Sequence, residues 1–258
     1  MKMKTIILCG GTGYRLKEET EFKPKPMVEI GGKPILWHVM KIYAHFGFRD
    51  FIIALGYKGN MIKDYFANKK FYDGDFTLNT FSHKIRHHRQ ENNDNFKITF
   101  VNTGLESLTG ERVRRVQKYI KEKYFMLTYG DGLTDINIGN LIKFHKNHGK
   151  IGTVSGVFPM LKFGGFDFSP DTGIISNFEK KAKIRHRING GFMIFKKNVF
   201  KYIKPDSMIE DVFPTLIDKK QLMLFDHSGF FHAMDTYQDM QDLNEMWQHN
   251  PAWKIWKG

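Results

Sequence analysis

Cysteine is nearly absent from the chain, since Cys9 is the only one among 258 residues. A disulfide within the chain and a zinc site built from cysteines are therefore excluded. The sequence also has no apolar run near the ~18 residues that a membrane-spanning helix needs, and no signal-peptide pattern at its start. No stretch rich in proline, glycine or serine divides the chain, and no segment repeats. We therefore expect one domain over residues 1–258, located in the cytoplasm and without a membrane partner.

Acidic residues are in the minority. The 40 lysines and arginines outnumber the 27 aspartates and glutamates, so the net charge is +13. Such a charge is compatible with binding nucleic acid and equally with an enzyme that handles phosphorylated small molecules. The basic residues are scattered along the chain, and no nucleic-acid-binding motif is present. The dispersal favours small anionic ligands, and we expect no nucleic-acid partner.

Neither of the two common phosphate-binding loops is present, since the chain has no G-x-x-x-x-G-K-[ST] and no G-x-G-x-x-G. Three glycines nevertheless fall within four residues, directly after the apolar run Thr5–Leu8. They are Gly10, Gly11 and Gly13. Glycine permits positive φ and lets backbone N–H groups approach a bulky anion, so with Arg15 close behind the segment predicts a polyphosphate cradle. A tight strand-to-helix turn would also explain the glycines alone.

Two lysines follow in the sequence K-P-K-P-M. Both prolines favour an extended backbone and break any helix there. Lys23 and Lys25 are alternate residues of this extended segment, so their side chains should point the same way. We expect one lysine to face the ligand and the other to be its neighbour or to pair with Glu18 or Glu19.

Strand and helix patterns alternate along the first half of the chain, which predicts βαβ units. The expected strands are short buried runs, and the expected helices carry apolar residues at helical spacing. We therefore predict an α/β fold with a Rossmann-like, mostly parallel mixed sheet flanked by helices. Strands are expected at 5–8, 50–55, 124–128, 152–158, 174–178 and 192–195, and helices at 34–46, 61–68, 111–122, 138–148 and 237–247.

Residues 71–100 differ in character from their surroundings. Strand-like runs at 76–78 and 97–101 enclose a polar, basic stretch at 84–95. This pattern predicts an inserted β-hairpin arm over about 71–100.

Two aspartates follow strand-like runs, the expected strand at 124–128 and the run at 230–234. Asp131 lies in Tyr129-Gly130-Asp131-Gly132, and Asp235 ends the run F-F-H-A-M-D. Ligands of doubly wound sheets bind at the carboxyl ends of the strands, where the glycine cluster should also lie. Two carboxylates beside a polyphosphate are suitable ligands for Mg²⁺, which takes its other oxygens from phosphate and water. Taken singly, Asp131 is also a common turn residue and Asp235 a common N-cap.

These elements together predict a reaction. A nucleoside triphosphate held by cations and Mg²⁺ is attacked in line at its α-phosphate by a phosphate monoester, and pyrophosphate leaves. The attacking oxygen is already anionic, so no enzymatic base is required and catalysis is positioning with charge neutralisation.

The motifs, taken in order, resemble those of a known family. G-G-T-G-Y-R-L, K-P-K-P-M-V-E-I-G-G-K-P-I-L, Y-G-D-G, F-E-K and N-G-G are similar to the sugar-1-phosphate nucleotidylyltransferases. The stretches P-M-V-E-I-G-G-K-P-I-L-W-H, G-Y-K-G, T-G-x-x-S-x-T-G-x-R, M-D-T and P-A-W-K-x-W resemble the glucose-1-phosphate cytidylyltransferases within that family. The likeness covers essentially the whole chain.

The resemblance implies a role for individual residues. Contacts to the nucleotide are implied at Leu8, Gly10, Gly11, Thr12, Gly13, Tyr14, Arg15, Lys25, Ser107, Arg112 and Gly130. Contacts to the sugar phosphate are implied at Glu179, Lys180, Asn189 and Gly190. The implied catalytic residues are Arg15, Lys25 and Asp131, and the implied Mg²⁺ ligands are Asp131 and Asp235.

The chain departs from the family pattern mainly on the side of the acceptor. Tyr14 replaces a small hydroxyl residue, Glu111 replaces a glycine, and the loop 181–187 is unusually basic. Arg185 and Arg187 in that loop suggest an extra anionic group on the substrate, although a solvated loop in a basic protein explains them as well.

The leading hypothesis is that CTP and glucose 1-phosphate give CDP-glucose and pyrophosphate. A close rival keeps the chemistry on another sugar 1-phosphate or a more anionic phosphate ester, and a third possibility is a non-catalytic nucleotide-binding regulator. The resemblance further implies a homo-oligomer, a trimer or hexamer, with the arm in its contacts.

Overall fold

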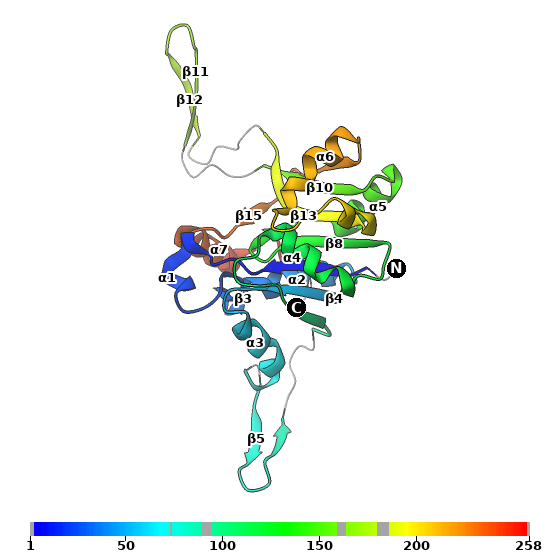
Figure 1. Cartoon of the computed structure of the whole chain (residues 1–258). Helices are drawn as coiled ribbons and strands as arrows, with labels where there is room; N and C mark the ends of the chain where they lie inside the picture. Colours follow the sequence, from blue (N-terminus) through cyan, green and yellow to red (C-terminus); the bar gives the residue numbers. More distant parts are fainter. Residues whose placement is uncertain (1–2, 73, 89–93, 159–163, 180–185, 257–258) are drawn as a thin grey trace.

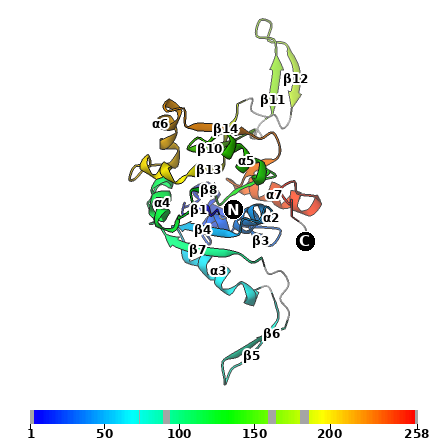
Figure 2. The same cartoon turned by 90° about the vertical axis from the view of Figure 1, so that its right-hand side faces the viewer.

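A seven-stranded mixed sheet forms the centre of the molecule (Figures 1 and 2). The computed structural model describes residues 3–72, 74–88, 94–158, 164–179 and 186–256. The strands of this sheet lie in the order β14-β10-β13-β8-β1-β4-β7. They are β14 (Leu222–Asp226), β10 (Gly152–Val157), β13 (Ile188–Lys196), β8 (Tyr124–Tyr129), β1 (Thr5–Cys9), β4 (Asp50–Leu55) and β7 (Lys97–Asn102).

Parallel pairing joins four neighbouring strands, β8, β1, β4 and β7, and it also joins β10 to β14. Only β13 runs antiparallel to both of its neighbours, β8 and β10. β1 is buried along its whole length, as a strand covered on both faces should be. The predicted Rossmann-like, mostly parallel mixed sheet is confirmed.

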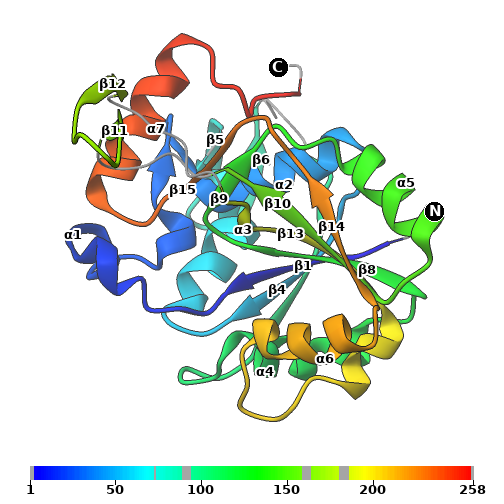
Figure 3. The same ribbon diagram turned by 90° about the horizontal axis from the view of Figure 1, so that it is seen from above.

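Helices cover both faces of the sheet (Figure 3). Successive residues of a strand point to opposite faces, and those of β1 divide accordingly between two cores. Ile7 and Cys9 pack in one core, and Ile6 and Leu8 pack in the other. The first core is closed by α2 (Ile35–His45), α5 (Ile138–His148) and α7 (Tyr237–His249), and the second by α4 (Thr109–Val116) and α6 (Phe213–Asp218).

The remaining elements are short or peripheral. The helix α3 (Gly59–Tyr72) is longer than predicted, whereas α4 ends before the 3₁₀ turn Gln117–Tyr119 and is shorter than predicted. The others are α1 (Lys17–Thr20), β2 (Glu29–Ile30), β3 (Lys33–Pro34), β9 (Gly132–Thr134), β15 (Phe231–Ala233) and 3₁₀ turns at Tyr14–Leu16, Lys25–Met27, Lys197–Lys201 and Ile209–Val212. Within the described ranges, no helix is long and apolar enough to cross a membrane.

The predicted partner of the 76–78 strand was wrong. β5 (Phe76–Asn79) pairs with β6 (Lys84–His87), and this hairpin projects from the body. Residues 97–101 instead form β7, the edge of the central sheet, parallel to β4 with Asp50 opposite Lys97. Nearness in sequence suggested that the two runs pair with each other. The actual partner of β7 is β4, which is separated from it in the sequence by α3 and the hairpin.

A second hairpin was not predicted. β11 (Gly165–Phe168) pairs antiparallel with β12 (Ile175–Glu179), and it projects at the opposite end of the molecule from β5–β6 (Figures 1 and 2). The expected strand at 174–178 therefore exists, but it belongs to this hairpin and not to the central sheet.

Candidate active site

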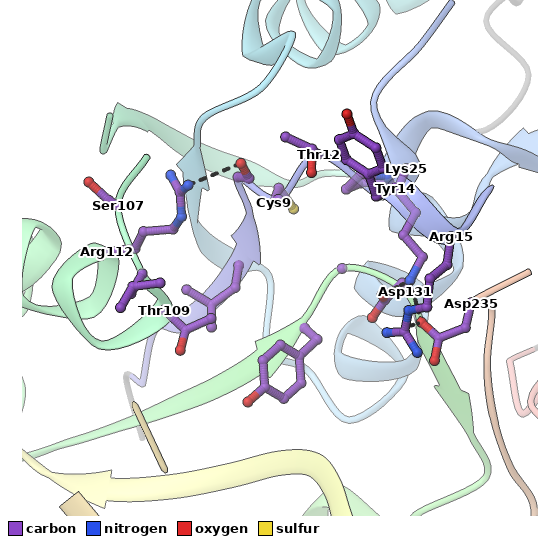
Figure 4. Close-up of a pocket in the computed structure, with 18 of the residues that line it drawn as sticks. Cys9, Thr12, Tyr14, Arg15, Lys25, Ser107, Thr109, Arg112, Asp131 and Asp235 are labelled. Carbon is purple, nitrogen blue, oxygen red and sulfur yellow. Dashed lines mark hydrogen bonds and ion pairs between the residues drawn. The ribbon is translucent and has the colours of Figure 1, made fainter. Parts of the chain in front are cut away.

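A cavity of about 390 Å³ opens at the carboxyl ends of β1 and β8 (Figure 4). Parallel neighbours end at the same edge of a sheet, so the loops after these two strands meet there. The glycine-rich loop and Gly130–Asp131 therefore face one another across the cavity, as predicted. The lining residues are Leu8 to Arg15, Lys25, Pro26, Ser107, Leu108, Thr109, Arg112, Tyr129, Gly130, Asp131, Met208 and Asp235.

One end of the cavity holds two carboxylates around an ammonium group. Lys25 Nζ lies 2.5 Å from Asp131 Oδ2 and 2.7 Å from Asp235 Oδ1. Arg15 Nη2 lies 3.0 Å from the same Asp235 oxygen. Burial disfavours the charged ammonium, but the charges and hydrogen bonds of Asp131 and Asp235 outweigh it and raise the pKa of Lys25. The four predicted residues are thus brought together (Figure 4).

A small antiparallel pair brings the two aspartates together. β9 follows Asp131 directly, and β15 precedes Asp235, with Ala233 opposite Gly132. The Met234 N–H donates to the Asp131 carbonyl oxygen at 2.9 Å. The carboxylates are therefore neighbours although over a hundred positions separate them in the sequence.

One lysine pairs with a glutamate and the other faces the cavity, as predicted, but the backbone is not extended throughout. Lys23 pairs with Glu19 at 3.2 Å, which leaves Lys25 to face the cavity. Pro24 is extended, with φ −67° and ψ 147°, yet Lys25–Met27 form a 3₁₀ turn. Proline is tolerated in the first turn of a helix because no N–H is needed there. The K-P-K-P segment is therefore only partly extended.

The glycines serve different purposes. Only Gly13 takes positive φ, 67°, where the 3₁₀ turn Tyr14–Leu16 begins. Gly10 is needed for another reason, because a Cβ there would lie 2.2 Å from the Arg112 guanidinium carbon. A Cβ on Gly11 would meet nothing within 4 Å. The expectation that all three glycines supply unusual backbone angles was therefore wrong for Gly10 and Gly11.

Arg112 clamps the backbone around the cavity. Its guanidinium donates to the carbonyl oxygens of Gly10 at 3.0 Å and Leu105 at 2.9 Å. It also donates to Gly104, Leu55 and the Thr103 hydroxyl. The side chain is buried, and desolvation lowers its pKa. Direct contact of these nitrogens with a nucleotide would require release of one of these bonds.

Glu111, which the sequence marked as a departure, supports the same region. It is buried and accepts from Arg114 Nε at 2.7 Å and from Arg115 Nε at 2.7 Å. These bonds, Arg114 first, lower the pKa of Glu111 to about 2 against the effect of burial. Arg115 in turn donates to the Thr103 carbonyl oxygen at 2.9 Å, so Glu111 helps to hold the loop after β7.

Tyr14 lies at the open rim. It is 72% exposed, and the Lys17 ammonium lies 4.7 Å from the centroid of its ring. Ser107, at the opposite end of the cavity, donates to the Thr103 carbonyl oxygen at 2.5 Å. Gly130 is closely packed, since a Cβ there would lie 2.8 Å from Cys9 Sγ. Burial is the main cause that raises the pKa of the Cys9 thiol.

The residues implied for the sugar phosphate are not in the cavity lining. Glu179 ends β12 and is exposed, while Asn189 and Gly190 follow the first residue of β13. Asn189 is nevertheless connected to the cavity, because its Nδ2 lies 3.4 Å from Glu210, which also accepts from Tyr129. Lys180 lies outside the described residues. Sequence reasoning missed Met208 and Glu210, which no motif indicated, and gave no role to Thr109, although Thr109 lies within the T-G-x-x-S-x-T-G-x-R stretch.

Arg187 already has a carboxylate partner. Its guanidinium pairs with Asp226, with Nη2 at 2.7 Å from Oδ2, and lies 3.2 Å from the centroid of the Phe158 ring. These contacts account for the position of the Arg187 side chain, so no extra anionic group on a substrate is needed to explain it. Arg185, the other arginine of that suggestion, lies outside the described residues.

The donor set fits a magnesium ion held jointly with a substrate. Asp131 and Asp235 direct hard oxygen atoms to one point, where the Lys25 ammonium now lies. The described part of the chain contains no cluster of three or more His, Cys, Asp or Glu that would hold a metal unaided. Mg²⁺ at substrate phosphates commonly takes only one or two protein carboxylates.

Comparisons with known proteins agree with this geometry. Residues 4–254 match the model of a family described as "Nucleotidyl transferase". The chain belongs to this family. It is 44% identical to the glucose-1-phosphate cytidylyltransferase of Salmonella typhi, over 99% of this chain and 100% of that protein. It is 40% identical to the probable glucose-1-phosphate cytidylyltransferase of Bacillus subtilis, over 98% and 100% of the two chains.

Solved structures share the fold at low sequence identity. A putative glucose-1-phosphate thymidylyltransferase from Bacillus anthracis superposes with a TM-score of 0.71 at 18% identity, covering 99% of this chain and 97% of that one. A UDP-glucose pyrophosphorylase gives a TM-score of 0.68 at 15% identity, covering 96% and 99%. These two structures therefore share the fold of this chain.

Proposed function

We propose that the protein condenses CTP with glucose 1-phosphate to give CDP-glucose and pyrophosphate. The convergence of Lys25, Asp131 and Asp235 beside the glycine-rich loop carries the chemistry of this proposal. The choice of substrates is supported by full-length similarity to the cytidylyltransferases of Salmonella and Bacillus. CTP and a sugar 1-phosphate are thus the proposed small-molecule partners.

Different residues of the cavity bind different parts of the two substrates. Backbone N–H groups of the loop Gly10–Gly13 and the guanidinium of Arg15 bind the triphosphate. Lys25 neutralises the phosphates that approach each other, which otherwise repel. An oxygen of the sugar phosphate attacks the α-phosphorus, that bond forms as the bond to the leaving pyrophosphate breaks, and no proton need be removed.

We propose Mg²⁺ as the cofactor, with Asp131 and Asp235 as its ligands. When bound with the triphosphate, it supplies charge neutralisation to the phosphate oxygens. The protein's own part is to hold the two carboxylates together, which the β9–β15 pair does.

The proposal is tested by measuring pyrophosphate release. Each of the four ribonucleoside triphosphates is combined with glucose 1-phosphate, other sugar 1-phosphates and a more anionic phosphate ester. Turnover should require CTP and glucose 1-phosphate. Turnover with CTP and a different acceptor would favour the rival substrate, and no release with any pair would leave only nucleotide binding without catalysis.

We also propose that residues 1–258 form a single domain with β5–β6 as a projecting arm, acting in the cytoplasm as a homo-oligomer, a trimer or hexamer. The hairpins support the oligomer, because two-stranded hairpins are marginally stable alone in water and both expose large apolar side chains. These are Phe76, Leu78, Phe81 and Ile85 in one, and Phe166, Phe168, Ile174, Ile175 and Phe178 in the other.

A further inference from the structure

Glu210 is a carboxylate beside the cavity that has no cationic partner among the residues that the structure describes. It lies in the 3₁₀ turn Ile209–Val212. Its Oε1 accepts a hydrogen bond from the Tyr129 hydroxyl and lies 3.4 Å from Asn189 Nδ2. Its Oε2 is buried and has no hydrogen-bond partner in the part of the chain that the structure describes. Buried unpaired oxygens destabilise a fold, so such a residue calls for a compensating role.

Tyr129 is the group through which Glu210 reaches the cavity. Tyr129 ends β8 and lines the cavity beside Gly130. Its ring packs on the backbone of Gly191, where a Cβ would lie 2.5 Å from Cδ2. Gly191 has a φ of 78°, which side-chain-bearing residues rarely adopt. The ring of Tyr129 is therefore held against the backbone of Gly191, and its hydroxyl is held by Glu210.

Asn189 is held in the same network. Its Oδ1 accepts from the Gly191 N–H at 2.9 Å, while its Nδ2 is directed to Glu210. The first residues of β13 thus supply both the amide beside Glu210 and the glycine that contacts the ring of Tyr129. The network joins the cavity to a residue that the family resemblance implies for the sugar phosphate.

We propose that Glu210 is a positioning residue for the acceptor, which sets the ring of Tyr129 and the amide of Asn189 against the sugar phosphate. This inference rests on the proposed function of the same site. Glu210 acts through these two side chains and not by direct contact, because its Oε2 is buried and its Oε1 is already bonded. Within the described ranges, the metal and triphosphate end, at Lys25 and Asp235, shares no hydrogen bond with this network.

Steady-state kinetics with each substrate varied separately test the proposal. Glu210→Ala should raise the KM for glucose 1-phosphate about tenfold, with the KM for CTP changed less than about twofold. Tyr129→Phe should act in the same direction. Glu210→Gln keeps an oxygen that accepts from Tyr129, so it should restore most of the loss. Glu29→Ala, which removes an exposed carboxylate elsewhere, serves as the control and should match the wild type.

Three results would overturn the proposal. They are an equal rise in both KM values, a lowered melting temperature with both KM values unchanged, and a glutamine variant as impaired as the alanine variant. If Glu210→Ala does not fold, the glutamine and Tyr129→Phe variants carry the test. If the wild type releases no pyrophosphate, the proposed function fails by itself. Calorimetric binding of glucose 1-phosphate and of CTP then replaces kinetics, and equal loss of both would contradict the positioning role.

Discussion

At the scale of single residues, Lys25 is the centre of the candidate site. Its ammonium lies between two carboxylates that would otherwise repel each other, and it is only 12% exposed. A cation in this place stabilises the ligand-free protein and at the same time competes with any metal that approaches without a nucleotide. Substrate phosphates give Lys25 another anionic partner when the metal arrives.

Replacement of Lys25 by methionine should therefore separate metal binding from catalysis. We expect Lys25→Met to bind Mn²⁺ at least about tenfold more tightly than the wild type without nucleotide, a gain of about 1.4 kcal/mol. Turnover should fall by about a hundredfold or more, because the phosphates lose their counter-ion. Titration of Mn²⁺ followed by electron paramagnetic resonance measures the first effect, with Lys23→Met as the matched control. Unchanged Mn²⁺ affinity in Lys25→Met would contradict this account.

At the scale of elements, sequence patterns identified those whose signal is local. β1, β4 and β8 are short buried runs, and α2 and α5 carry apolar residues at helical spacing. The pairing of β7 with β4 and the departure of β12 from the main sheet depend on distant residues, which periodicity does not reveal. Periodicity also could not reveal the hydrogen bonds of Arg112, because its partners come from the ends of β1, β4 and β7, which are distant in the sequence.

The C-terminal segment closes over α2 through aromatic contacts that include a buried histidine. His38 is fully buried, and its Nε2 lies 2.8 Å from the Ile30 carbonyl oxygen. Trp253 Nε1 donates to His38 Nδ1 at 3.4 Å, so this nitrogen must be free of a proton. Burial accordingly lowers the pKa of His38 to about 4.

Acid should therefore weaken the fold through His38. Because its pKa is lower in the folded state, the unfolded chain takes up the proton first, and stability present above pH 6.5 is lost as the pH falls toward 4. Between about pH 7 and pH 5 this loss is roughly 2 kcal/mol. Urea unfolding at both pH values should show it, and His38→Gln should have a flatter dependence. An equally steep dependence in that variant would count against His38 as the source.

At the scale of the whole molecule, the two hairpins both expose apolar side chains, and their charges are of opposite sign. β5–β6 spans Lys84 and Arg86 with no carboxylate, whereas Gly165–Glu179 contains three carboxylates and no lysine or arginine. Because the two lie at opposite ends, contact between unlike hairpins of successive copies would be head-to-tail and would generate a ring if it closes.

Light scattering should therefore give the mass of a trimer or hexamer of this 30.3 kDa chain. Phe81→Asp in one hairpin and Phe178→Asp in the other should each lower that mass, because each buries a charge in an apolar contact. Ile217→Asp on α6, which replaces a side chain 60% exposed, is the matched control and should leave the mass unchanged. A monomeric wild type, or hairpin variants that assemble normally, would refute this role.

The transfer of a cytidylyl group to a sugar phosphate is the central claim, and one isotope measurement tests it directly. Glucose 1-phosphate labelled with ¹⁸O in its phosphate oxygens is incubated with unlabelled CTP and Mg²⁺, and both products are weighed by mass spectrometry. Attack of the sugar phosphate on the α-phosphorus predicts CDP-glucose that retains all of the label and pyrophosphate that contains none. Label in the pyrophosphate, or no CDP-glucose, would contradict the account.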